Sequence, residues 1–258
     1  MALSTADRLR PPTLGLRSEL VEAAWNHGYR SERGEADGWL YFASDIGVPG
    51  EIGLAVAAKG ATWFLAVEHA GVAVELTAEP ALPIPAGKRA AFRFASSSML
   101  REALHRAYDL ARSLPSAPLA EFEAEVASLG ATEAEVLVRR RIGQDIFRRA
   151  LMRYWDGRCP LTGITEPALL RASHIVPWAE CLSDAERLNV HNGLLLAAHW
   201  DAAFDSGLVS FGDTGEAQFS PALGEAALKA LRADMTMPLP LTIEHRNRLA
   251  RHRQRYGY

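Results

Sequence analysis

The chain has 258 residues, of which 48% are hydrophobic and 23% are charged, and its formal net charge is −3. Two domains of ordinary size are therefore expected, each with enough apolar residues for a core of its own. The near-neutral charge neither requires nor excludes a nucleic-acid partner, whereas two cysteines, Cys159 and Cys181, are too few for a disulfide framework or for zinc knuckles built from cysteine pairs.

The hydropathy pattern indicates a cytoplasmic protein without a membrane partner. Met1 to Pro12 is polar and carries arginine, so it lacks the apolar core of a signal peptide. No apolar run reaches the length of a membrane-spanning helix. We therefore expect both cysteines to be reduced, and Cys159 to be a small buried apolar residue.

The first part of the chain is typical of an α+β domain. Leu14 to His27 has apolar residues at helical spacing, and a second amphipathic helix is expected from Met99 to Leu114. Between these helices, short runs of β-type residues predict strands at 39–42, 52–57, 63–67, 72–76 and 89–94. We expect the strands at 63–67 and 72–76 to form a hairpin, in a small antiparallel sheet flanked by helices.

Aromatic residues are dense in this first domain, which has no catalytic constellation. We interpret them mainly as core residues, while one or two of them could instead line a pocket or stack on a base. The residues are Trp25, Tyr29, Trp39, Tyr41, Phe42, Trp63 and Phe64.

A long helix is predicted from Val136 to Trp155, and a capping box at Thr132 to Glu135 begins it. An acidic helical segment, Leu119 to Gly130, precedes the capping box. The expected organisation is a recognition or sensor domain at residues 1–118, a linker helix at 119–135 and a second domain at 136–258.

Arginines are concentrated on two predicted helices. The helix at 136–155 carries six of them, and a final helix at 242–256 carries five. A solvated basic face explains such a pattern as well as phosphate contacts do, and for the final helix both interpretations stay open. For the helix at 136–155, its closeness to the motif described below favours DNA-backbone contacts, which we expect from Arg140, Arg148 and Arg149 of that helix and from Arg171 beside the motif.

The most informative stretch runs from Ala172 to Gly207. His174 leads into Ile-Val-Pro, Asn192-Gly193 turns the chain, and residues 194–196 are three leucines suited to a buried strand. Trp200 to Phe204 has the spacing of a helix opening. The predicted order is a β-hairpin followed by a helix, and a second hairpin at 208–211 and 217–219 with a short helix at 223–231 follows it.

This order of residues resembles the HNH endonuclease family, whose ββα-metal fold has a His at the end of the first strand. The resemblance implies an α+β fold class in which a small N-terminal α+β domain precedes a C-terminal ββα-metal nuclease domain. It implies that His174 is the general base and that Asn192 ties the loop together by backbone hydrogen bonds. It also places the last metal ligand of the family at Asp201.

The remaining metal ligands are less defined by the sequence. Asp205 lies four residues after Asp201, so both project from one helical face. Many family members have Asp or His immediately before the general base, but this chain has Ser173. His199 is an alternative ligand, although residues two apart do not share a helical face. Whether Asp205 or His199 completes the shell stays open at this stage.

The chemistry that the resemblance implies is hydrolysis of a phosphodiester bond in double-stranded DNA. A histidine removes a proton from water near neutral pH, and a divalent cation neutralises charge on the phosphate. A carboxylate-rich site favours Mg or Mn over Zn. One active site per chain makes a homodimer a natural arrangement for cutting both strands.

Three functional hypotheses remain open on the sequence. The lead-in from Arg141 to Gly163 resembles restriction-type, McrA-like HNH proteins that attack modified DNA, which favours a modification-dependent defence nuclease. A second hypothesis is a DNA-binding module with a decayed nuclease centre, because of Ser173. A third is an effector or toxin nuclease triggered through its first domain.

Overall fold

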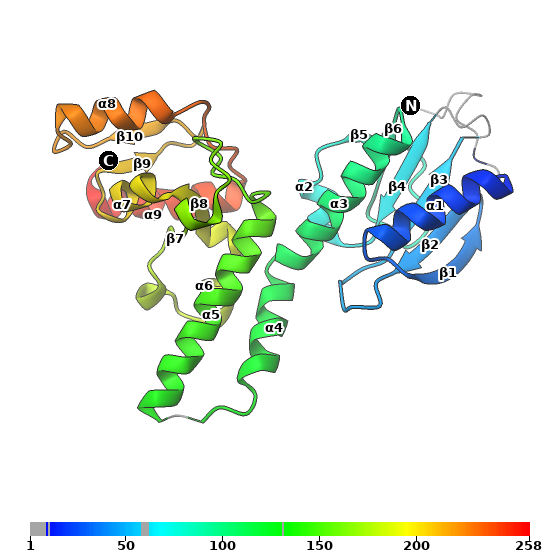
Figure 1. Ribbon diagram of the computed structural model, residues 1–258, viewed down its shortest axis with the longest axis horizontal. Helices are drawn as coiled ribbons and strands as arrows, with labels where there is room; N and C mark the ends of the chain where they lie inside the picture. The colour runs from blue at the N-terminus through cyan, green and yellow to red at the C-terminus, as the bar shows by residue number, and fades with distance from the viewer. Residues whose placement is uncertain (1–8, 10, 58–61, 131) are drawn as a thin grey trace. The chain divides into compact units, whose positions relative to one another are not determined.

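The computed structural model describes residues 9, 11–57, 62–130 and 132–258 (Figure 1). It separates into two compact units, Met1–Arg112 and Ser113–Tyr258. Most of the segment from Met1 to Pro12, where no signal peptide is expected, lies outside the described residues. The domain limits at 118 and 135 stay predictions, since they concern functional domains rather than packing units.

The first unit is a six-stranded antiparallel sheet with helices. Its elements are α1 (Leu14–Asn26), β1 (Ser31–Ala36), β2 (Trp39–Ala43), β3 (Ile52–Val56), β4 (Trp63–Val67), α2 (Ala70–Glu75), β5 (Glu79–Pro80), β6 (Ala90–Phe94) and α3 (Ser97–Ser113). The strand order is β1-β2-β3-β4-β6-β5. This confirms the predicted α+β class and the helices expected at both ends of the sheet.

Strands β3 and β4 are buried at every position, so both faces of the sheet are covered. On one face, Trp39 and Phe64 pack edge to face among alanines of the central strands. The aromatic residues predicted as core are buried or half-buried, with the exception of Trp25, which is 54% exposed and lies under Arg30.

The predicted hairpin of 63–67 with 72–76 is wrong, because residues 70–75 form helix α2. His69 caps this helix: its Nδ1 accepts a hydrogen bond from the amide of Val72. The partner of β4 is instead β6, in the register Trp63 to Phe94 and Val67 to Ala90. A local cap and a more distant strand together overrode the β propensity of the valines.

The second unit contains a helical pair followed by short strands and helices. Its elements are α4 (Ser116–Val126), α5 (Glu133–Tyr154), η2 (Pro167–Leu169), β7 (Leu170–His174), η3 (Trp178–Glu180), α6 (Asp184–Arg187), η4 (Val190–Asn192), β8 (Gly193–Ala197), α7 (Ala198–Asp205), β9 (Val209–Phe211), β10 (Ala217–Phe219), α8 (Glu225–Asp234) and α9 (Ile243–Tyr256). The predicted order of hairpin and then helix is confirmed by β7, β8 and α7, and the second predicted hairpin by β9 and β10.

Helices α4 and α5 lie side by side (Figure 1), and the capping box between Thr132 and Glu135 begins α5 as predicted. Further along α5, Ile146, Phe147 and Leu151 are buried and pack toward the β7–β8 hairpin. The long helix therefore supports the segment that carries the predicted motif.

Within the residues that the structure describes, no helix is both long and apolar enough to cross a membrane. Both cysteines are buried and unpaired, as expected from their number.

Gly193 should be a sensitive packing position. A Cβ built there would lie 2.8 Å from Leu151 and closer still to the ring of Phe147, in an interior with no free space. We expect Gly193→Ala to destabilise the second unit by about 1–3 kcal/mol through overpacking. The free energy of unfolding from hydrogen exchange of amides in 133–258 measures this.

Gly224→Ala is the matched control, because a Cβ there has no atom within 4 Å and the backbone φ is −65°. Equal stability losses in the two variants would contradict the close contact between β8 and α5.

Candidate active site

His174 ends strand β7 and is held on three sides. Its Nε2 lies 2.9 Å from the carbonyl oxygen of Arg187, its ring stacks on Phe147 with centroids 3.8 Å apart, and the ring of Trp178 meets it edge on. Burial lowers the pKa of His174 to about 4, and the Arg187 carbonyl opposes this only in part. The imidazole is therefore neutral at pH 7.

The hydrogen bond to Arg187 also determines the tautomer of His174. A carbonyl oxygen only accepts, so Nε2 must carry the hydrogen, and in a neutral ring Nδ1 is then the acceptor. A general base requires such a neutral ring with a free acceptor nitrogen. The His174 side chain also remains partly exposed.

The Arg187 side chain holds the loop that presents its carbonyl. Its guanidinium donates to the carbonyls of Trp178 and Cys181, at 3.2 and 2.7 Å, and pairs with Asp184 at 3.0 Å. It also lies over the ring of Trp178. One cation thus fixes both the carbonyl and the aromatic ring that surround the imidazole of His174.

Asn192 is fully buried at the end of η4 and closes the same loop. Its Oδ1 accepts from the amide of Val176 at 2.9 Å, and its Nδ2 donates to the Val176 carbonyl at 3.2 Å and to the Glu186 carbonyl at 3.4 Å. The Asn192 carbonyl in turn accepts from Ile175. These bonds match the loop-closing contacts expected of this residue, while its catalytic importance stays a prediction.

Two carboxylates gather on the other face of β7. Asp201 lies in the first turn of α7 and Asp205 is its last residue, one helical turn apart. Burial raises the pKa of Asp201, against the influence of Ser173 and Arg171; burial and then the Asp201 charge raise the pKa of Asp205. The carboxyl groups of Asp201 and Asp205 therefore share an environment in which their ionised forms are less favourable than in water.

Ser173 is the residue of β7 that lies next to these carboxylates. Its side chain is buried, and its hydroxyl interacts with the carboxylates, which lowers the pKa of both Asp201 and Asp205. Buried hydroxyls normally have a partner, and here the two carboxylates supply it. Ser173, Asp201 and Asp205 therefore form one polar cluster.

His199 is turned away from this pair. Its Nε2 lies 2.8 Å from a carboxylate oxygen of Asp234 in α8. Of the two alternatives that the sequence left open, the structure therefore places Asp205 beside Asp201 and commits His199 to a different contact.

The pleat of β7 separates the two groups of residues. Ser173 faces α7 with its carboxylates, and the next residue, His174, lies against Phe147 of α5. Among the described contacts, none joins the His174 ring to either carboxylate. The two groups are close in the chain because Ser173 and His174 are consecutive residues, and not because their side chains touch.

Helix α9 anchors the helix that carries the carboxylates. His252 stacks on Phe204 at 3.9 Å, lies 3.2 Å from the Phe204 carbonyl through Nε2, and lies 3.0 Å from the Ser210 hydroxyl through Nδ1. The Tyr256 hydroxyl donates to the backbone carbonyl of Asp205 at 2.9 Å. Residues more than forty positions apart thus fix the orientation of α7.

The four arginines expected to contact DNA have different surroundings. Arg148 donates to the carbonyls of Pro167 and Leu170, and Arg149 pairs with Glu121 and Glu125 of α4. Arg171 donates to backbone carbonyls next to it and influences Asp201. Arg140 is exposed. Their contacts with DNA stay predictions.

The donor set fits a hard divalent cation. In the described part of the chain, no three His, Cys, Asp or Glu side chains form a closed metal cage, so a structural zinc site has no counterpart there. Two carboxylates beside a buried hydroxyl offer the oxygen ligands that hard divalent cations prefer. Asp201 and Asp205 are the residues that would hold such an ion.

Comparison with protein families agrees with this geometry. Residues 159–212 match the family model of the HNH endonucleases, and this segment includes β7, β8, α7 and β9. The match covers about a fifth of the chain and places an HNH endonuclease domain within the second unit. No curated protein matched the chain.

Sequence reasoning missed the residues that orient the site. His252 acts through contacts with a segment 48 residues away, whereas Arg187 and Trp178 act within the loop between His174 and Asn192. None of the three belongs to the motif pattern. The signal for Arg187 was weak: an arginine inside a polar loop between two motif residues.

Replacing Asn192 tests the loop closure. We expect Asn192→Ala to lower the free energy of unfolding of the second unit by about 2–4 kcal/mol, because it leaves the buried amide and carbonyl of Val176 without partners. Asn189→Ala is the control: it removes one bond, to the amide of His191, and should cost about 1 kcal/mol. Chemical denaturation measures both, and equal losses would contradict a special role for Asn192.

The second unit should also lose stability in acid. Burial is the main cause that lowers the pKa values of His174 and His252 to about 4 and of His245 to about 3, from an ordinary 6.5. Below pH 6.5 the unfolded chain therefore binds more protons than the folded one, so stability is complete above pH 6.5 and falls toward pH 4.

Each unit of pKa difference contributes about 1.4 kcal/mol per histidine, and the raised pKa values of the two aspartates offset part of this loss. Unfolding free energies measured between pH 7 and pH 4 test the prediction. A flat profile would show that these histidines take up protons in the folded state.

Proposed function

We propose that this protein is a metal-dependent endonuclease that hydrolyses phosphodiester bonds of DNA. The observation that carries the proposal is the state of His174: a neutral imidazole whose Nε2 is committed to the Arg187 carbonyl, at the end of a strand whose other face meets two carboxylates. It lies inside the segment that matches the HNH endonucleases.

In the proposed reaction, Nδ1 of His174 accepts a proton from a water molecule, and the water oxygen forms a bond with phosphorus. The bond from phosphorus to the 3′-oxygen breaks, and the leaving oxygen takes a proton from solvent. Phe147 and Trp178 restrict the ring, so it approaches the water in one orientation. Asn192 holds Ile175 and Val176, the two residues after His174, in place.

Asp201 and Asp205 would hold the divalent cation, Mg²⁺ or Mn²⁺ rather than Zn²⁺. When bound, the cation supplies charge neutralisation at the scissile phosphate and the departing 3′-oxygen. The two carboxylates suit this role because burial and mutual repulsion make an unneutralised pair unfavourable.

The first unit would supply recognition. It is a separate compact unit with its own core, and the aromatic residue Trp25 is exposed on it beneath Arg30. By analogy with McrA-like restriction enzymes, the substrate would be modified double-stranded DNA in the cytoplasm, and a homodimer would cut both strands.

A second candidate function rests on Ser173. Because a hydroxyl stands where many relatives of this fold have a metal-binding acid, the protein could bind DNA without cutting it. The two functions differ in one measurable property, which is strand cleavage that depends on an added divalent ion.

Replacing the proposed base gives the direct test. We expect His174→Ala to lower the rate of plasmid nicking in Mg²⁺ or Mn²⁺ by about 10²–10⁴-fold, with DNA binding retained. Asp201→Asn should raise the Mn²⁺ concentration needed for half-maximal nicking. His199→Ala is the matched control, since that ring contacts Asp234 and should leave nicking unchanged.

If the wild type and His174→Ala are equally inactive while both bind DNA, the binding-only function is correct. Methylated, phosphorothioated and unmodified plasmids in the same assay test the proposed preference for modified DNA.

A further inference from the structure

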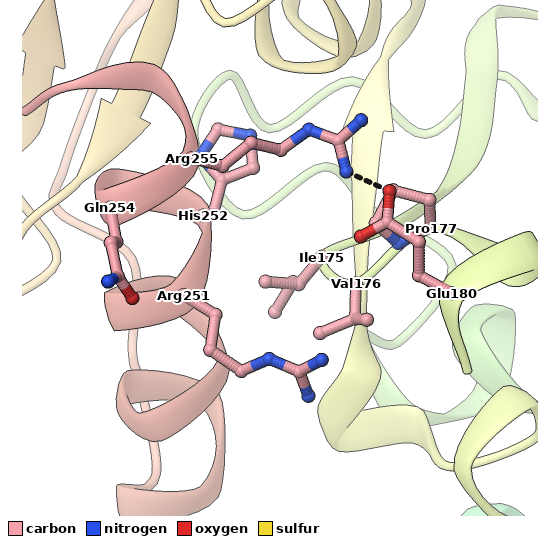
Figure 2. Close-up of a pocket in the computed structure, with 8 residues that line it drawn as sticks. All are labelled: Ile175, Val176, Pro177, Glu180, Arg251, His252, Gln254 and Arg255. Carbon is pink, nitrogen blue, oxygen red and sulfur yellow. Dashed lines mark hydrogen bonds and ion pairs between the residues drawn. The ribbon is translucent and has the colours of Figure 1, made fainter. Parts of the chain in front are cut away.

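A cavity of about 230 Å³ opens between the segment that follows His174 and helix α9 (Figure 2). Its apolar lining includes Ile175 and Val176, the first two residues after His174. Both lie in the loop that Asn192 closes. Whatever occupies this cavity is therefore held by the same loop that fixes the imidazole.

Two arginines of α9 form the other side of the cavity. Arg251 and Arg255 are four residues apart, so they lie on one face of the helix. Figure 2 shows both guanidinium groups extending from α9 toward the 175–180 segment, on either side of the Ile175 and Val176 side chains. Apolar side chains therefore line the middle of the cavity, and the guanidinium groups of Arg251 and Arg255 lie at its edges.

Each of these guanidinium groups currently has an acidic partner. Arg255 pairs with Glu180, and Arg251 pairs with Glu186 at 3.2 Å. Both arginine side chains are about half exposed, as is Glu180. Glu186 is only 21% exposed, and its carboxylate also accepts a hydrogen bond from the amide of Leu182 at 2.8 Å. An ion pair exposed on both sides stabilises a fold very little, so phosphate replaces Glu180 at small cost, whereas replacing Glu186 costs more.

The other arginines of α9 are engaged elsewhere. Arg253 donates to the Phe211 carbonyl and pairs with Asp213, and Arg248 pairs with Glu244 on its own helix. Arg246 donates to the Leu241 carbonyl. Among the arginines of this helix, Arg251 and Arg255 are the two that line the cavity.

A phosphate group is the anion that suits this arrangement. Guanidinium groups remain charged at any physiological pH, and they bind phosphate oxygens through paired hydrogen bonds. The cavity is smaller than the roughly 300 Å³ at which pockets for drug-sized molecules begin, so it suits a single group rather than a whole small-molecule ligand.

We propose that Arg251 and Arg255 bind a backbone phosphate of the DNA strand, next to the phosphate that is cleaved, and that Glu180 and Glu186 occupy these arginines when DNA is absent. The inference rests on the proposed nuclease function and adds a second phosphate site to it. DNA binding is then an exchange of carboxylate for phosphate at two guanidinium groups.

The exchange is tested by binding of a labelled DNA duplex, measured by anisotropy in EDTA so that no cleavage occurs. We expect the double variant Arg251→Gln with Arg255→Gln to bind at least tenfold more weakly. The slope of log K against log salt should become less steep by about one, because the contact with one phosphate is lost. Arg246→Gln, on the same helix but away from the cavity, is the control and should bind as the wild type does.

The variant Glu180→Gln should change DNA affinity in the opposite direction. It therefore distinguishes competition with phosphate from a structural role of the Arg255–Glu180 pair. If Glu180 competes with phosphate, its removal should tighten DNA binding about threefold or more at low salt. If the pair with Arg255 merely holds α9 in place, the same variant should bind DNA less well. A gain in affinity cannot come from misfolding, so this variant remains informative even when the arginine variants are unstable.

The inference is overturned if the double arginine variant matches Arg246→Gln in affinity and salt slope, or if Glu180→Gln weakens binding. Nicking of plasmid in Mg²⁺ or Mn²⁺ is measured separately on the wild type. A wild type that nicks DNA while the arginine variants bind normally contradicts the second phosphate site alone. A wild type that binds DNA but never nicks it contradicts the nuclease function alone.

Discussion

The amide side chain of Asn192 is the constraint on which the candidate site depends. It hydrogen-bonds to both the amide and the carbonyl of Val176. These bonds hold the chain after His174 next to the start of β8, just beyond the last backbone pair of β7 and β8. Since the group is fully buried, water cannot replace either bond. The Arg187 carbonyl that contacts His174 lies in the loop that Asn192 closes, and so do Ile175 and Val176 on one side of the cavity, whose other side is formed by α9.

Strand β7 then distributes the chemistry over two faces. Its alternation directs Ser173 to the carboxylates of α7 and His174 to the aromatic surface of α5. Different parts of the unit support each face: Phe147 backs the imidazole, whereas His252 and Tyr256 of α9 hold α7. The proposed base and the proposed metal ligands are therefore positioned by different elements, on the two faces of one strand.

The sequence was most informative where a property is local. The capping box at Thr132 and the helical spacing of Asp201 and Asp205 depend on neighbouring residues, and the structure has both. Asn192-Gly193, expected to turn the chain, is instead the end of η4 followed by the first residue of β8. Residues 72–76 were mistaken for a strand because their β propensity says nothing about the His69 cap or about β6, which takes the place beside β4. His252 was missed because its contact with Phe204 joins segments 48 residues apart, which spacing along the chain does not encode. Arg187 was missed because it acts within an irregular loop, where no periodic pattern indicates which carbonyls a side chain contacts.

Many arginines of the second unit are paired with acidic side chains in the folded protein. Arg139 pairs with Asp184 and Arg149 with Glu121, and four of the five arginines of α9 pair with carboxylates. The basic face that the sequence predicts for α9 is therefore largely neutralised. Affinity for a polyanion then depends less on excess positive charge than on how easily phosphate displaces each carboxylate. Because exposed pairs exchange easily and buried ones do not, exposure of the partner acid, rather than the number of arginines, determines which positions can contact a nucleic acid.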